Sequence, residues 1–164
     1  MKRRSSLSTV VIAALVVALC ASRSDAQIGA TVQPSARLDA FGARIRAVQA
    51  GVGLSIPAGT NLRLSLVGAL GGSAERGGPT GVSARVDGIA RFLLDPTFGT
   101  RWTPYAGGGM SLRYDHGPEW RGVLVLLVGV EGPRSGGVVP FVEAGWGGGV
   151  RVGFGFRMAM RRGR

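Results

Sequence analysis

The sequence predicts an all-β protein, a closed antiparallel up-and-down β-barrel of about eight strands. Two observations lead to this prediction. Apolar residues alternate with small or polar residues along most of the chain, which is the two-residue period of a β-strand. Glycine accounts for 29 of the 164 residues, and a glycine inside a helix costs about 1 kcal/mol. The hydrophobic fraction of 45% also excludes a disordered chain.

The N-terminus, residues 1–26, has the three-part pattern of a cleavable secretory signal peptide. Residues 2–4 are basic, residues 10–21 form an apolar run, and small residues precede the boundary between Ala26 and Gln27. A spanning helix needs about 20 apolar residues, so this run is too short for a membrane anchor. We therefore expect export from the cytoplasm and cleavage between Ala26 and Gln27.

Removal of this segment changes the charge and the available chemistry. The formal net charge of +11 falls by 3 to +8, and nearly all of the basic residues are arginines. The only cysteine, Cys20, lies in the signal peptide, so the mature chain can form no disulfide. The only histidine is His116, and no residues have the spacing of a metal site or of a nucleophile elbow. No cofactor is therefore expected.

Alternation defines seven strands, with a short eighth before them. After a lead-in at residues 27–36, the barrel domain is expected at residues 37–158, followed by a basic tail at residues 159–164. The expected strands cover residues 37–42, 48–56, 62–70, 82–92, 105–114, 122–130, 141–146 and 150–158. Clusters of Gly, Pro, Asp and Thr separate them, as is typical of turns. The segment 122–130 differs from the others because it is apolar on both faces.

Alternation alone does not say which face of the barrel points inward. A membrane barrel has its apolar face outside, whereas a soluble lipocalin-like barrel has it inside. The polar face here is rich in glycine, which would weaken a solvent-facing strand but leaves room for large side chains in a narrow lumen. We therefore predict an interior network of charged residues, whose excess of four arginines implies lumen water or anions. Its expected members are Arg63, Arg85, Asp87, Arg91, Arg113, Arg121, Glu131, Glu143, Arg151 and Arg157.

Aromatic residues on the apolar face lie toward the strand ends. Transmembrane barrels carry such aromatic girdles at the two membrane interfaces. The expected girdle residues are Phe92, Tyr114, Trp120, Trp146 and Phe156. Together with the signal peptide, they favour a transmembrane β-barrel.

These features resemble the small eight-stranded outer-membrane β-barrel proteins of Gram-negative bacteria. The resemblance covers residues 40–158. In detail the chain is similar to an uncharacterised group of such barrels, and the matching segments are residues 90–96, 102–109, 129–133 and the final strand at 150–156. It implies a location in the outer membrane and insertion by the outer-membrane assembly machinery. The chain departs from the pattern at its end, because a basic tail follows Phe156 where such barrels often end on an aromatic residue.

The expected role is structural or surface-interacting, without catalysis, because the side chains that fill an eight-stranded barrel prevent free diffusion through it. The expected partner is outer-membrane lipid, with Arg44, Arg46 and Arg76 near one rim and Arg101, Arg134 and the tail near the other, where they can meet lipopolysaccharide phosphates. Nucleic acid is not expected to bind an exported chain with dispersed arginines.

Three alternatives remain open at this point. One is a soluble periplasmic lipocalin-like barrel that binds an apolar ligand. Another is a small anion-selective pore, suggested by the arginine excess. The third is a lipid-acting barrel enzyme that depends on His116 beside Asp115.

Overall fold

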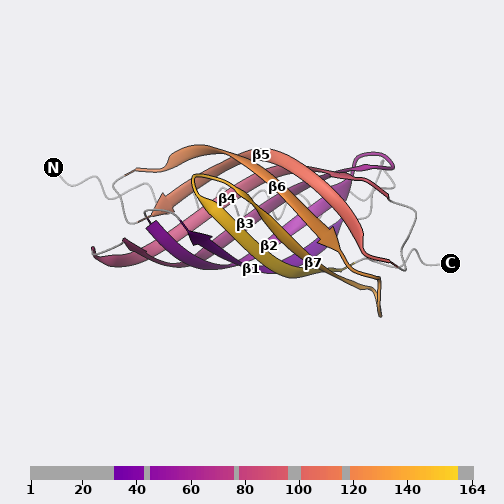
Figure 1. Cartoon of the computed structure of the whole chain (residues 1–164), viewed down its shortest axis with the longest axis horizontal. Helices are drawn as coiled ribbons and strands as arrows, with labels where there is room; N and C mark the ends of the chain where they lie inside the picture. Colours follow the sequence, from indigo (N-terminus) through magenta and orange to yellow (C-terminus); the bar gives the residue numbers. More distant parts are fainter. Residues whose placement is uncertain (1–31, 43–44, 76–77, 96–100, 116–118, 159–164) are drawn as a thin grey trace.

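The computed structural model describes residues 32–42, 45–75, 78–95, 101–115 and 119–158. They form eight antiparallel strands in a closed barrel, and neighbouring strands follow one another in sequence until β8 pairs with β1 (Figure 1). The strands are β1 (Gln33–Gly42), β2 (Ile45–Pro57), β3 (Leu62–Glu75), β4 (Thr80–Leu93), β5 (Thr103–Asp115), β6 (Arg121–Glu131), β7 (Val138–Trp146) and β8 (Val150–Met158). The structure thus confirms the predicted fold class. The predicted signal peptide, the predicted rim residues Arg44 and Arg76, His116 and the basic tail lie outside the described residues.

The first strand begins four residues earlier than predicted, so residues 33–36 belong to the barrel rather than to a lead-in. Pro34 explains why this part of the strand was hard to recognise, because proline cannot donate to a β-ladder. It pairs with Leu54 of β2, whereas the pairing of β1 with β8 begins only at Ser35. The missing N–H of Pro34 therefore costs the barrel no bond to β8.

The outer surface of the barrel is apolar on every strand. Large side chains there are well exposed, for example Leu38, Val48, Leu64, Val82, Met110, Leu124, Val142 and Val152. On β4 the exposed band runs from Val82 to Phe92, a length of about 33 Å at roughly 3.3 Å per residue. With the usual strand tilt of about 40°, this length gives a height of about 25 Å, which matches the apolar band of transmembrane barrels.

Glycines on the inner face allow the backbones of neighbouring strands to approach closely. A Cβ atom at Gly109 would collide with the carbonyl oxygen of Gly88 on β4, and one at Gly155 would collide with the backbone of Ala36 on β1. Gly88 itself faces outward, where a Cβ atom would meet nothing within 4 Å. The glycine-rich face is thus the interior, as the sequence predicted.

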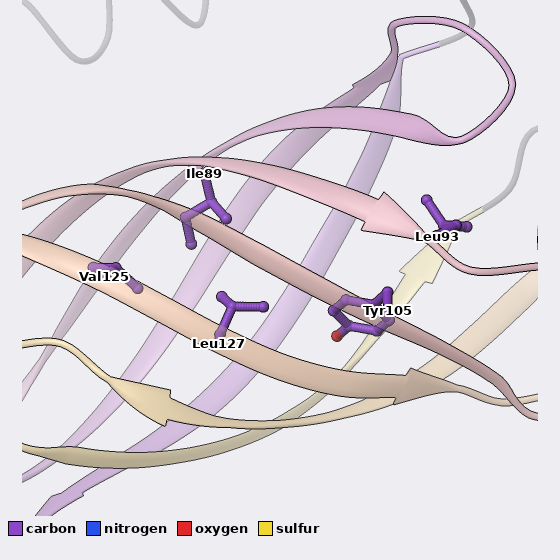
Figure 2. Packing of buried hydrophobic residues seen from close by; sticks show 5 residues of the cluster. All are labelled: Ile89, Leu93, Tyr105, Val125 and Leu127. Carbon is purple, nitrogen blue, oxygen red and sulfur yellow. The ribbon is translucent and has the colours of Figure 1, made fainter.

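One wall of the interior is apolar. The side chains of Ile89, Leu93, Tyr105, Val125 and Leu127 pack together there, on the adjacent strands β4, β5 and β6 (Figure 2). Val125 and Leu127 face inward on β6, while its alternate residues face outward. This wall explains why the sequence of β6 is apolar on both faces.

Connections at both ends of the barrel are short, with two to nine residues between successive strands. The terminus end, at which β1 begins and β8 ends, carries the β2–β3, β4–β5 and β6–β7 connections. The β1–β2, β3–β4, β5–β6 and β7–β8 connections lie at the opposite end, which we call the hairpin end. In the β6–β7 connection Gly136 and Gly137 have φ angles of 58° and 86°, a conformation that glycine adopts without strain.

Candidate functional site

The interior of the barrel holds a network of ion pairs. Among the described residues it contains seven arginines and five carboxylates, so its excess is 7 − 5 = 2 positive charges rather than the four expected. The arginines are Arg37, Arg63, Arg85, Arg91, Arg113, Arg151 and Arg157, and the carboxylates are Asp39, Asp87, Asp115, Glu131 and Glu143. These side chains fill the lumen and pair both within strands, as Arg113 does with Asp115, and between strands, as Arg91 does with Glu143.

Asp39 lies at the centre of this network with a fully buried side chain. It accepts two hydrogen bonds from Arg37, at 2.8 and 2.7 Å, and one from Arg85 of β4 at 2.5 Å. Arg151 of β8 donates a longer bond of 3.4 Å to the same carboxylate and one of 3.0 Å to Asp87. A single buried carboxylate thus joins β1, β4 and β8 across the lumen.

Glu143 is a second buried carboxylate of the network, and it connects β7 to β1, β4 and β5. It accepts hydrogen bonds from Arg37 at 2.6 Å, from Arg91 at 2.9 Å and from the hydroxyl of Tyr105 at 2.9 Å. Its side chain is only 2% exposed. Buried charges of this kind are tolerable only when they are paired and hydrogen-bonded, as they are here.

Smaller groups of ion pairs lie toward the two ends of the barrel. At the terminus end Glu131 pairs with Arg63 and, at 2.6 Å, with Arg157. At the hairpin end Arg113 pairs with Asp115 at 2.5 Å, and Asp115 also accepts a 2.6 Å hydrogen bond from Ser83. Charged side chains therefore occupy the lumen along its length.

Phe41 supports three of these arginines. Its buried ring lies 4.4 Å from the guanidinium carbon of Arg113, 4.9 Å from that of Arg85 and 5.7 Å from that of Arg151. A desolvated cation over an aromatic face contributes about 0.5–2 kcal/mol. Phe41 therefore offsets part of the desolvation of three guanidinium groups.

Replacing Phe41 by leucine is expected to lower the free energy of unfolding by about 2 kcal/mol, because leucine remains apolar but is somewhat smaller and offers no π face. Urea titration of the protein refolded in phospholipid vesicles would measure this change. The matched control is Phe154→Leu, at an exposed position on the outer face of β8, where a loss below about 0.5 kcal/mol is expected. Equal losses for the two variants would contradict the role given to the Phe41 ring.

The structure brings together nine of the ten residues that the sequence assigned to the interior, and Arg121 is the exception. Arg121 is exposed, because it is the first residue of β6 and lies at the rim of the hairpin end, opposite Arg113. Three network residues were missed by the sequence analysis. Arg37 and Asp39 lie on β1, which the sequence predicted only as a short eighth strand, and Asp115 ends β5 where a turn was expected.

Aromatic side chains lie at both ends of the apolar surface. Trp120 and Trp146 are exposed toward the hairpin end, where the ring of the half-buried Tyr114 lies 5.7 Å from that of Trp120. Phe92 and Phe156 lie toward the terminus end. Trp102, 59% exposed just before β5, extends this second group and was missed because it lies outside the alternating segment.

The burial pattern bears on two of the alternatives. A lipocalin-like barrel would expose the arginine face and enclose an apolar cavity, but here the arginines are buried and the apolar face is outside. Against an open pore, paired charged side chains fill the lumen along its length, and the pocket near the terminus end has an accessible volume of only about 10 Å³. The third alternative depends on His116, which lies outside the described residues.

The described part of the chain contains no helix long and apolar enough to span a bilayer. It also contains no group of three or more His, Cys, Asp or Glu side chains placed to hold a metal ion.

The apolar outer band, the charged interior and the closed eight-stranded topology define the fold of the outer-membrane β-barrels. Solved structures of this class are similar to the chain. Neisserial surface protein A aligns with a TM-score of 0.58 at 16% identity, covering 81% of this chain and all of that one. The N-terminal β-barrel domain of Pseudomonas aeruginosa OprF aligns with a TM-score of 0.54 at 13% identity, covering 77% of this chain and 96% of that one.

A designed protein has the same fold. The solution structure of the de novo designed TMB2.3 aligns with a TM-score of 0.57 at 15% identity and covers 82% of this chain and 98% of its own. No family model and no curated protein sequence matches the chain. At 13–16% identity these similarities show the fold of the chain and not its biological role.

Proposed function

We propose that this chain is a non-enzymatic structural protein of the outer membrane, a plugged barrel that spans the bilayer and contacts lipid headgroups at its rims. The observation that carries the proposal is the division between the two faces of the same strands. The outer face is apolar over a height of about 25 Å, and the inner face is occupied by paired charges. A lumen filled in this way supports a role in the membrane itself rather than the passage of solutes.

The rims supply the surface for interaction. Arg46 and Arg121 are exposed at the hairpin end, and Arg101 and Arg134 are exposed at the terminus end, beyond the apolar band. Arginine binds phosphate with a planar pair of N–H donors. These positions support contacts with the phosphate groups of outer-membrane lipid, lipopolysaccharide among them.

Replacing Leu126 by arginine is expected to destabilise the protein in phospholipid vesicles by about 2–4 kcal/mol, the cost of a cation at the bilayer midplane. Leu126 is the central residue of β6 and is 69% exposed on the outer face. The control is Val82→Arg, equally exposed at 63% but close to the strand end, where a cost below about 1 kcal/mol is expected. Reversible urea unfolding in vesicles measures both.

The depth dependence distinguishes a membrane surface from a water-facing one. On a surface in contact with water, both substitutions would change the stability by less than about 0.5 kcal/mol. Equal and small effects at the two positions, or recovery of folded monomer without lipid or detergent, would overturn the membrane proposal. Fractionation of cells that express the tagged chain then tests the outer membrane in particular.

A further inference from the structure

The charges of the interior network are distributed unevenly along the barrel axis. The half toward the hairpin end is balanced, with three arginines and three aspartates, namely Arg85, Arg113, Arg151, Asp39, Asp87 and Asp115. The half toward the terminus end holds three arginines and two glutamates, namely Arg63, Arg91, Arg157, Glu131 and Glu143. Arg37 lies between the halves, because it pairs with both Asp39 and Glu143. Since the first half is balanced by itself, the excess of two positive charges comes from the second half together with Arg37.

A small cavity lies among these same six side chains. Both of its carboxylates are already engaged, Glu131 by Arg63 and Arg157, and Glu143 by Arg37, Arg91 and the hydroxyl of Tyr105. The glutamates therefore cannot neutralise the arginines any further.

Two features of the arginines point to a missing negative charge. Arg63 and Arg91 are directly opposite each other on β3 and β4, an arrangement in which like charges destabilise a sheet. The side chain of Arg157 is only 7% exposed, and its Nε has no hydrogen-bond partner. A buried charged donor without a partner is costly, so an acceptor at this point would stabilise the barrel.

We propose that this cavity binds one monatomic anion, chloride in ordinary saline, between Arg63, Arg91 and Arg157. The size of the cavity sets the class of ligand, because about 10 Å³ of accessible space admits a single particle close to the size of water. Phosphate and sulfate are too large. The anion supplies the negative charge that the two glutamates do not.

The anion reaches this position from the terminus end. The side chains of Arg63 and Glu131 are 13% and 10% exposed, whereas those of Arg37 and Glu143 on the inner side of the cavity are 1% and 2% exposed. Beyond them the balanced half of the network blocks the lumen. The site is therefore a pocket that is blocked at its inner end and not a step on a conduction path.

The test uses the full chain refolded in detergent, with sodium chloride replacing sodium gluconate at constant ionic strength. The midpoint of thermal unfolding is expected to rise saturably by about 4 °C in chloride. Bromide is expected to act like chloride, while sulfate has no effect beyond that of gluconate. Crystals grown in bromide are expected to show an anomalous peak among Arg63, Arg91 and Arg157.

Two variants localise the effect. Arg157→Gln is expected to lose the chloride-dependent rise, while Arg121→Gln, which removes an exposed arginine, keeps it in full. Because Arg157→Gln can fail to fold, the bromide peak in crystals of the unaltered protein tests the anion site without any variant. A midpoint that does not depend on chloride, or a cavity that holds water and no bromide, would overturn the proposal. Neither result concerns the outer surface, so the membrane role is tested separately.

Discussion

Replacing Glu143 by glutamine is expected to lower the free energy of unfolding by about 3–5 kcal/mol, the cost of removing one partner from a buried ion pair. Glutamine has almost the same shape, so the change removes charge rather than volume. Arg37 and Arg91 would lose the carboxylate that they share, in a site where Glu143 is only 2% exposed. Tyr105 would keep at most a neutral acceptor.

The measurement is urea unfolding in phospholipid vesicles, followed by the fluorescence of the three tryptophans. The matched control is Glu119→Gln, an exposed carboxylate at the hairpin end, with an expected change below about 0.5 kcal/mol. A loss below 1 kcal/mol for Glu143→Gln, or a loss equal to that of Glu119→Gln, would contradict the role of Glu143 in filling the lumen.

The second large effect is expected at Gly109, where alanine should destabilise the barrel by about 3 kcal/mol. The added Cβ atom would meet the backbone of Gly88 and Ile89 on β4, and backbone cannot move aside as a flexible side chain does. The neighbouring strands would have to separate, which weakens the hydrogen bonds between β4 and β5.

Gly88→Ala provides the control for this prediction, because Gly88 faces Met110 of β5 across the same strand pair but points outward into open space. Alanine there is expected to leave the stability unchanged or raise it by about 0.4–1 kcal/mol, since it restricts the unfolded chain. Both variants can be compared by urea titration in vesicles. Equal losses at Gly88 and Gly109 would indicate a general need for glycine in these strands instead of a close backbone approach.

The sequence was sufficient to predict the faces of the strands, because side chains alternate strictly and the glycines mark the crowded side. It was not sufficient to predict the ends of the strands. Arg121 has the correct parity for the interior but lies at a rim, and Asp115 belongs to β5 although a turn signal follows it. A period of two says nothing about where the interior stops.

The sequence also did not predict which carboxylate each arginine would pair with. Arg37 and Glu143 are 106 residues apart, and they meet only because β8 lies between β7 and β1 and the register of these strands is fixed. Register depends on how the whole barrel closes, and the alternation of a single strand contains no such information. The arginines could therefore be assigned to the lumen before any of their partners was known.

The seam between β1 and β8 constrains the order in which the molecule can assemble. Arg151 of β8 reaches Asp39 of β1 across 112 residues of sequence, so these charges cannot neutralise each other before the two ends of the chain meet. An incomplete sheet would carry unpaired guanidinium groups on one face and unsatisfied backbone groups at both edges. Pairing of β1 with β8 removes both penalties at once, so a half-formed barrel is unstable. In the membrane proposed for this chain, insertion and closure of the barrel are therefore expected to occur as one all-or-none event.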